Sequence, residues 1–122
     1  SMINGEFNQK GELVFEVGLI AADESITWAE AILDTGFTGW LLVNEQDAIT
    51  LGWKRDIKPK IVQTAGGEAV LNIYEGIVLI EGEELIVRVL AGDEIKEVLL
   101  GVRWLRFKRL VADFSAGVLT LG

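Results

Sequence analysis

Residues 31–36 read Ala31-Ile32-Leu33-Asp34-Thr35-Gly36, and this stretch decides how the chain is interpreted. An apolar run leads directly into an acidic residue, and a glycine-containing loop at 36–39 and a second apolar run at 40–43 follow. Asp-Thr-Gly alone is also typical of an ordinary turn, in which Asp bonds the local backbone. The apolar flanking residues favour a functional role over a plain turn, because a carboxylate between two buried strands costs desolvation energy unless it is paired or neutralised. Asp34 is therefore the first candidate for chemistry.

The composition restricts what this chemistry can be. The 122 residues fit one domain, and 50% hydrophobic with 25% charged residues indicate a packed core. The 19 acidic and 11 basic residues give a net charge of -8, which argues against a nucleic-acid partner because phosphate binding needs surplus Lys and Arg. The absence of Cys and His excludes disulfides, thiol and imidazole catalysis, and metal sites built on those residues. A general acid or base must then be Asp, Glu, Lys or Tyr.

The first residues of the sequence show no targeting pattern. No basic stretch followed by a long apolar run is present, so we expect no membrane partner and a cytoplasmic location. Ser1 before Met2 is typical of a residue left by tag removal, and we expect residues 1–5 to be disordered or a tag remnant. A single domain is expected over 1–122.

Short apolar runs between 14 glycines and one proline predict an all-β domain with tight turns. Residues 12–20 alternate between apolar and polar side chains, which predicts a half-buried strand. Asn44 as an N-cap and Gly52 as a stop predict a short helix over 45–51, and a second helix is expected over 102–110. The remaining strands are expected at 26–33, 40–43, 60–64, 68–74, 77–81, 84–90, 98–100, 111–114 and 118–121, with hairpin turns at 65–67 and 81–83.

Three segments in order resemble the retropepsin-like aspartic proteases, in particular the bacterial single-domain type. The stretch 31–36 is similar to the active-site motif, in which an apolar strand presents Asp-Thr/Ser-Gly. The hairpin Thr64-Ala65-Gly66-Gly67-Glu68 lies where the family places its flap, and Val98-Leu99-Leu100-Gly101 resembles the segment that passes beside the catalytic loop. The C-terminal residues 111–114, with the turn and strand that follow, resemble the end of bacterial members. Two positions depart from the retroviral pattern: Phe37 replaces a small residue, and no Arg follows Gly101 directly.

The resemblance implies a closed, all-β acid-protease barrel with one or two short helices, and it assigns roles to residues. Asp34 is the implied catalytic acid/base of an aspartic endopeptidase, and Thr35, Gly36, Leu100 and Gly101 are the implied support of the active site. Thr35 would bond across a dimer, and Gly36 would leave its N–H to bond the carboxylate. Ala65, Gly66 and Gly67 would form the substrate-binding flap over a peptide or protein substrate. No metal and no cofactor are implied.

The chemistry requires a second carboxylate. Peptide hydrolysis by carboxylates uses two Asp side chains about 3 Å apart that share one proton. This chain has a single Asp-Thr-Gly, and Asp113-Phe114-Ser115 lacks the glycine and is more typical of a turn after a strand. We therefore expect the second Asp34 from another copy, in a symmetric homodimer.

Two other functional interpretations stay open. The chain is alternatively a non-catalytic peptide-binding or dimerisation module on the same fold, or a monomeric β-barrel domain without an active site. Gly66-Gly67 also fits a plain hairpin turn. The cations at 103–109 are interpreted as a solvated helix face, and the four Trp residues as core or interface anchors.

Overall fold

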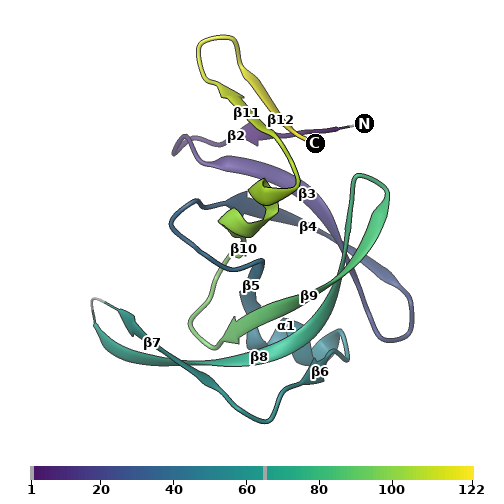
Figure 1. Cartoon of the computed structure of the whole chain (residues 1–122), viewed down its shortest axis with the longest axis vertical. Helices are drawn as coiled ribbons and strands as arrows, with labels where there is room; N and C mark the ends of the chain where they lie inside the picture. The colour runs from purple at the N-terminus through teal and green to yellow at the C-terminus, as the bar shows by residue number, and fades with distance from the viewer. Residues whose placement is uncertain (1, 65) are drawn as a thin grey trace.

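The computed structural model describes residues 2–64 and 66–122, and strands dominate this part of the chain (Figure 1). The strands are β1 (Ile3–Asn4), β2 (Glu6–Phe7), β3 (Leu13–Ile20), β4 (Ile26–Leu33), β5 (Leu41–Asn44), β6 (Lys54–Arg55), β7 (Lys60–Thr64), β8 (Gly67–Ile80), β9 (Glu83–Gly92), β10 (Val98–Leu100), β11 (Leu110–Asp113) and β12 (Val118–Leu121). One short α-helix, α1 (Glu45–Thr50), and one 3-10 helix, η1 (Val102–Arg106), complete the described elements. The expected β-rich character with one or two short helices is thereby confirmed.

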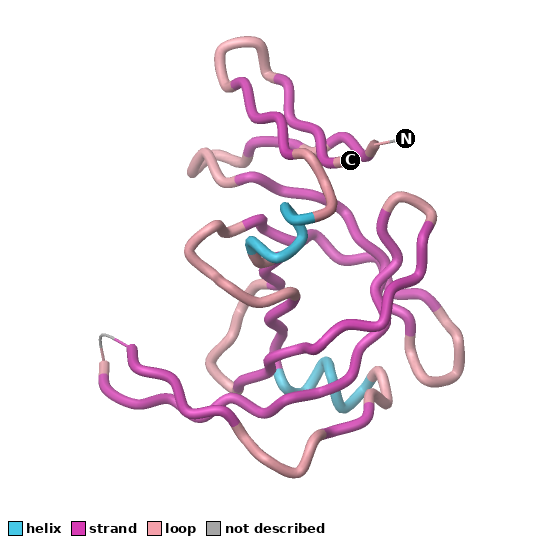
Figure 2. The backbone as a smooth tube through the Cα atoms, viewed as in Figure 1, coloured by secondary structure: helices cyan, strands magenta, loops and turns pink. Residues whose placement is uncertain are grey.

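Nine strands form one large, strongly bent sheet (Figure 2). Its neighbours run in the order β2-β3-β4-β10-β5-β9-β8-β6, and β7 pairs with β8. A further pairing joins β3 to β8, with Gly18 opposite Leu79. The pairings therefore lead from β3 through β4, β10, β5, β9 and β8 back to β3.

Strand β10 has a decisive place in this sheet. It lies between β4, to which it is parallel, and β5, to which it is antiparallel. Leu100 pairs with Leu33 on one side and with Leu41 on the other. A segment distant in sequence thus separates the two strands that flank the Asp34 loop, and its end is fixed beside that loop.

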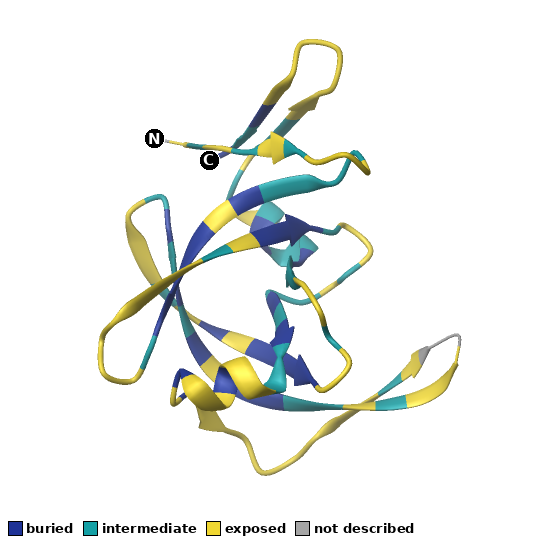
Figure 3. Cartoon of the chain, turned by 180° about the vertical axis from the view of Figure 1, so that it is seen from behind, coloured by how far each residue is buried: buried dark blue, intermediate teal, exposed yellow. Residues whose placement is uncertain are grey.

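The core follows from the alternation of apolar side chains (Figure 3). Phe15 and Val17 on β3 are fully buried, whereas Glu16 between them is exposed, as the period-two pattern predicts. The cluster continues across the sheet and includes Leu41, Val43, Val89, Leu100 and Trp104. Helix α1 begins at the predicted N-cap, because Asn44 accepts a hydrogen bond from Gln46 N at 2.9 Å, and Gly52 follows its end with a φ of 73°.

The two ends of the chain meet in a small second sheet, which lies at the top of Figure 1. Its order is β1-β12-β11, with Ile3 opposite Leu121. Within residues 1–5, which the sequence left as disordered or a tag remnant, Ile3–Asn4 pair with β12 in the structure. The aromatic ring of Phe7 also stacks on Phe114, with 4.2 Å between the ring centroids.

Strands predicted separately at 68–74 and 77–81 form one continuous strand of 14 residues, β8. Glu75 and Gly76 suggested a break, but both pair with β9. Gly76 serves close packing, because a Cβ there would lie 2.6 Å from Val89 Cγ2 and 2.9 Å from the ring of Trp53. The predicted turn at 81–83 is confirmed, with positive φ at Glu81 and Gly82.

The helix predicted over 102–110 is wrong beyond its first turns. Residues 102–106 form a 3-10 helix, and β11 already begins at Leu110. The backbone of Arg109 exchanges hydrogen bonds with Gly122, so pairing with the chain end replaces helix continuation. Within residues 2–64 and 66–122, no helix has the length and apolar character needed to cross a bilayer.

Candidate active site

Asp34 stands directly after β4 and is anchored by β10. Its backbone N–H donates to the carbonyl of Leu100 at 2.9 Å, one residue beyond the Leu33–Leu100 pair. The side chain is half-buried, whereas Thr35 and Gly36 are exposed. The parallel ladder therefore fixes where the strand ends and delivers the carboxyl group to the start of the loop. Leu100, expected from the sequence as a support residue, makes this contact.

The loop backbone orients the Asp34 carboxylate. Gly36 N–H donates to Asp34 Oδ1 at 2.8 Å, the contact expected of this glycine, and Phe37 N–H donates to the carbonyl of Asp34 at 3.1 Å. A Cβ on residue 36 would lie 3.1 Å from the same carboxylate oxygen. Glycine thus lets the amide approach the carboxylate without crowding it.

Gly101 locks the other half of the loop. A Cβ at this position would lie 1.8 Å from the carbonyl oxygen of Gly39, so only glycine fits. Gly101 N–H donates to Trp40 O at 3.0 Å, and Val102 N–H donates to Phe37 O at 2.8 Å. The backbone at 101–102 therefore crosses directly against the loop at 37–40.

Trp40 and Trp104 brace this crossing. The indole N–H of Trp104 donates to the Trp40 carbonyl at 2.8 Å, and the two rings meet edge to face with centroids 5.1 Å apart. Trp104 and Trp53 are buried and confirm the expectation of core anchors, whereas Trp28 is 57% exposed.

The β7–β8 hairpin lies on the same side of the molecule as the Asp34 loop (Figure 1). Of the expected flap residues, Ala65 lies outside the described residues, and Gly66 and Gly67 are exposed beside it. A cleft of about 600 Å³ lies between hairpin and loop, lined by Val62 and Gln63 on one side and by Gly36 and Phe37 on the other. The structure therefore brings together Asp34, Gly36, Leu100 and Gly101. Residues of β7 line the cleft beside this loop, whereas Gly66 and Gly67 at the hairpin tip are not among its lining residues.

Three cations also line this cleft, namely Lys60 on β7, Arg88 on β9 and Arg103 on η1. Sequence reasoning missed the first two and placed Arg103 on a solvated helix face. Arg103 is instead half-buried, with its guanidinium carbon 5.7 Å from the ring centroid of Trp40. A detectable signal existed for Arg88, which is the one charged residue in the apolar run 85–92.

The other cations of residues 103–109 lie in two different environments. Lys108 Nζ lies 2.6 Å from Glu81 Oε1, and these side chains are only 9% and 10% exposed. Arg106 and Arg109 are exposed, as expected. Lys108 therefore ties the start of β11 to the β8–β9 turn.

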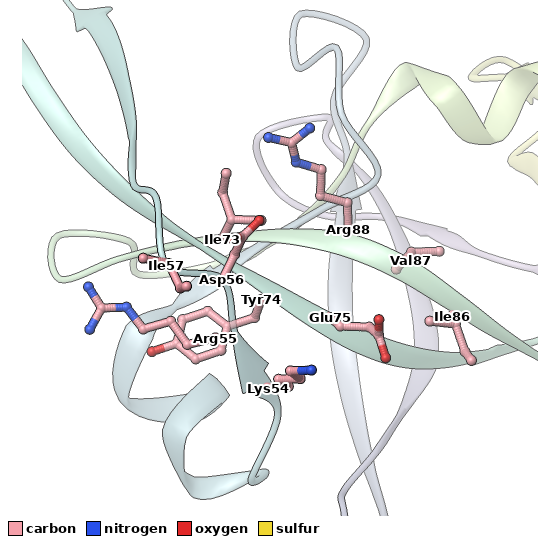
Figure 4. Close-up of a pocket in the computed structure, with 10 residues that line it drawn as sticks. All are labelled: Lys54, Arg55, Asp56, Ile57, Ile73, Tyr74, Glu75, Ile86, Val87 and Arg88. Atoms are coloured by element: carbon pink, nitrogen blue, oxygen red, sulfur yellow. The ribbon is translucent and has the colours of Figure 1, made fainter.

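A second hollow of about 610 Å³ lies on β6, β8 and β9 (Figure 4). Tyr74 on its wall donates its hydroxyl to Glu45 Oε2 at 3.0 Å, and Asn72 donates its amide to the same oxygen. Burial, followed by this bond and by the negative charge of Glu45, raises the pKa of Tyr74. The group links α1 to β8, away from the Asp34 loop.

The Asp113 segment is a turn, as the sequence indicated. Asp113 Oδ1 accepts from Ala116 N at 3.1 Å and from Ser115 Oγ at 2.9 Å, and these bonds lower the pKa of Asp113. Among residues 2–64 and 66–122, no three acidic, His or Cys side chains converge as a metal site.

The whole chain is similar to solved protease structures. A retropepsin-like aspartic protease from Rickettsia conorii superposes with a TM-score of 0.67 at 23% identity, covering 99% of this chain and 90% of that one. The chain has a retropepsin-like fold. Simian foamy virus (mac) protease also matches, with a TM-score of 0.54 at 24% identity, covering 80% of this chain and 99% of that one. EIAV protease in an inhibitor complex matches with a TM-score of 0.60 at 17% identity, covering 82% of this chain and 90% of that one. No protein-family model matches the sequence, and no curated protein does.

The resemblance stated from three motifs is therefore confirmed as a retropepsin-like fold. The motifs at 31–36 and 98–101 meet in space through the Asp34–Leu100 hydrogen bond. No single motif carried this conclusion. The conclusion rested on the presence of all the motifs in order, and the pairing of β4 with β10 shows that two of these segments are needed together.

Proposed function

We propose that this chain is an aspartic endopeptidase that acts as a homodimer, with its catalytic dyad formed by the Asp34 of each copy. The observation that carries the proposal is the Asp34 carboxylate on a retropepsin-like fold, oriented at 2.8 Å by the N–H of Gly36, a residue that lines the neighbouring cleft. A half-buried, backbone-oriented carboxylate at the end of a buried strand is suited to act on a bound substrate rather than to stabilise the core.

The proposed reaction needs one ionised and one protonated Asp34. The ionised carboxylate removes a proton from a water, whose oxygen attacks the peptide carbonyl carbon, while the protonated carboxyl donates its proton to the carbonyl oxygen. The resulting diol collapses when the C–N bond breaks, and the leaving nitrogen receives a proton from the dyad. Like charges at about 3 Å keep the two groups in different protonation states.

Support residues hold the dyad in place in this proposal. Thr35 is exposed beside Asp34 and bonds across the dimer, while Leu100 and Gly101 fix the loop from behind. The hairpin residues Gly66 and Gly67, together with Ala65, cover the substrate as a flap and exclude water. The closed circuit of pairings through β3 and β8 is consistent with a barrel that keeps this scaffold rigid.

The dimer interface in this proposal includes the terminal β1-β12-β11 sheet. That sheet has unpaired edges at β1 and β11, and it exposes apolar side chains at Phe114 and Val118. Each copy carries a net charge of -8, so association is expected to tighten as salt rises or as pH falls. A cytoplasmic location is part of the same proposal.

Cleavage of a peptide library by wild type and Asp34→Asn tests the function. The wild type is expected to show a bell-shaped pH dependence, and Asp34→Asn to lose cleavage by about a thousandfold or more while it still folds. Asp23→Asn is the matched control, because it makes the same chemical change in the exposed turn between β3 and β4, where Asp23 Oδ1 accepts from Ser25 N at 3.0 Å, and it is expected to cleave normally. Equal cleavage by Asp34→Asn and wild type would refute the proposal.

The same samples separate the rival interpretations. A peptide-binding or dimerisation module would bind peptides and dimerise without any cleavage that depends on Asp34. A monomeric domain would keep one apparent mass in sizing experiments at all concentrations. A strict monomer that still cleaves peptides would contradict the dyad.

A further inference from the structure

The cleft beside Asp34 has a charge opposite to that of the chain. Acidic residues outnumber basic ones, 19 to 11, yet the described residues that line this cleft include Lys60, Arg88 and Arg103 and no Asp or Glu. The three cations come from three separate elements, β7, β9 and η1, so the fold itself gathers them. Concentrated positive charge in a protein of net charge -8 is suited to attract a negative ligand group to this position.

No carboxylate of the described residues forms a direct ion pair with these cations. Over residues 2–64 and 66–122 the ion pair found is Lys108 with Glu81, so Lys60, Arg88 and Arg103 form no direct ion pair there. Arg88 is cross-strand to Glu75, but Figure 4 shows the two side chains pointing apart. Arg88 also lines the hollow of Figure 4, which contains Asp56 and Glu75, without forming a direct ion pair with either.

Arg103 is held in position without being neutralised. Its guanidinium lies over the Trp40 ring, and its Nε is buried with no hydrogen-bond acceptor among the described residues. A buried donor without a partner is unfavourable, and stacking on an aromatic ring leaves the charge intact. The arrangement fits an Arg whose electrostatic partner arrives with a ligand.

The cleft also extends to a residue in direct contact with the proposed reacting carboxylate. Gly36 lines it, and the same residue donates its N–H to Asp34 Oδ1. A peptide with its scissile bond at Asp34 therefore places a neighbouring side chain between the loop and the base of the β7–β8 hairpin. Leu42, Val62 and Leu90 supply apolar contact for the methylene groups of such a side chain.

We propose that this cleft recognises an acidic side chain, Glu or Asp, of the substrate peptide. The inference rests on the proposed endopeptidase function and specifies its substrate class. A two-fold dimer contains the cleft twice, so the acidic preference appears at one position on each side of the scissile bond. Arg88 and Lys60 are the specificity residues, and Arg103 supports them from η1.

The test compares peptides that differ only by Glu or Gln at each position around the scissile bond. Cleavage by wild type is expected to favour Glu at the matching positions by about 10- to 100-fold in kcat/KM, as for other charge-assisted contacts. The preference is expected to shrink as salt rises, and to vanish below about pH 4.3, where the Glu of the peptide is protonated. A preference based on shape alone would respond to neither.

Variants locate the preference on the cleft. Arg88→Gln and Lys60→Gln are each expected to lower the Glu/Gln ratio several-fold, and Arg88→Glu to favour Lys at the same peptide position. Arg106→Gln is the matched control, because Arg106 is exposed on the same 3-10 helix as Arg103 and does not line the cleft. Its ratio is expected to equal that of wild type.

Binding of the same peptides to Asp34→Asn separates this inference from the proposed function. Tighter binding of Glu peptides, lost in Arg88→Gln on the Asp34→Asn background, supports the inference even if wild type cleaves nothing. Cleavage that depends on Asp34 but ignores Glu against Gln at every position overturns the inference and leaves the protease function standing.

Discussion

Replacing Gly101 by alanine is the sharpest structural test of how the Asp34 loop is held. The added Cβ would lie 1.8 Å from Gly39 O and 2.5 Å from the Gly39 carbonyl carbon, and real Cβ contacts essentially never fall below 3.0 Å. Both clashing atoms belong to the backbone, so no rotamer change relieves them. The two segments must separate by about 1 Å, in a region packed as densely as a crystal.

That separation breaks hydrogen bonds whose lengths are known. Gly101 N–Trp40 O at 3.0 Å and Val102 N–Phe37 O at 2.8 Å cannot both survive it. Each lost bond costs about 1 kcal/mol net, and up to about 3 kcal/mol where a buried group stays unpaired. Gly101→Ala is therefore expected to lower the free energy of unfolding by about 3–5 kcal/mol, a large share of the roughly 5–15 kcal/mol typical of a domain.

Urea denaturation measures this loss, read as a lower midpoint at an unchanged slope. Gly117→Ala is the control, since Gly117 has a φ of 67° and a Cβ added there would meet no atom within 4 Å, so only backbone strain of about 1–2 kcal/mol applies. If Gly101→Ala costs no more than Gly117→Ala, the close crossing of 101 against 39 is refuted.

Two further predictions concern contacts outside the loop. Glu81→Gln is expected to destabilise the fold by about 2–4 kcal/mol, because it leaves the nearly buried Lys108 ammonium without its carboxylate. In urea denaturation, adding Lys108→Met to this variant is expected to recover part of the lost stability. If the losses of the two substitutions are strictly additive, the pairing is contradicted. Burial and Glu45 raise the pKa of Tyr74, so stability from its neutral phenol is complete below about pH 10, the unfolded value, and is lost as pH rises through the folded pKa. Unfolding measured from neutral to alkaline pH is expected to show this loss in wild type and not in Tyr74→Phe, and identical alkaline profiles would contradict it.

Local patterns in the sequence predicted most of the strands. Strand 26–33 matches β4 and strand 118–121 matches β12 at both ends, because apolar runs there are bounded by turn residues. Helix α1 was predictable from Asn44 and Gly52, which act through contacts within a few residues. Where backbone geometry is set by neighbours in the sequence, the residues alone were sufficient.

Elements decided by distant partners were not predictable in this way. β1 has two residues and exists because Ile3 and Asn4 pair with β12 at the other end of the chain. Likewise, Gly76 reads as a strand break until the Trp53 ring and Val89 are packed against it. These errors share one cause, since tertiary pairing overrides local propensity.

The candidate site shows the same division. Asp34 was identified from its apolar flanks, and Asp34, Gly36 and Gly101 from motifs that resemble family segments; the contact between Gly36 and Asp34 then spans only two residues. The cationic lining by Lys60, Arg88 and Arg103 joins three elements and has no local pattern. These three charges come together only in the folded chain, so the sequence could not predict their proximity.

The central claim is that Asp34 is half of a dyad completed by another copy. Wild type and Asp34→Asn should be unfolded and refolded together in varied ratios at constant total concentration, and peptide cleavage measured in each mixture. Because only wild-type pairs carry two carboxylates, activity is expected to follow the square of the wild-type fraction, falling to about a quarter in an equal mixture. A linear fall, to about a half, would mean that each copy works alone and would contradict the account.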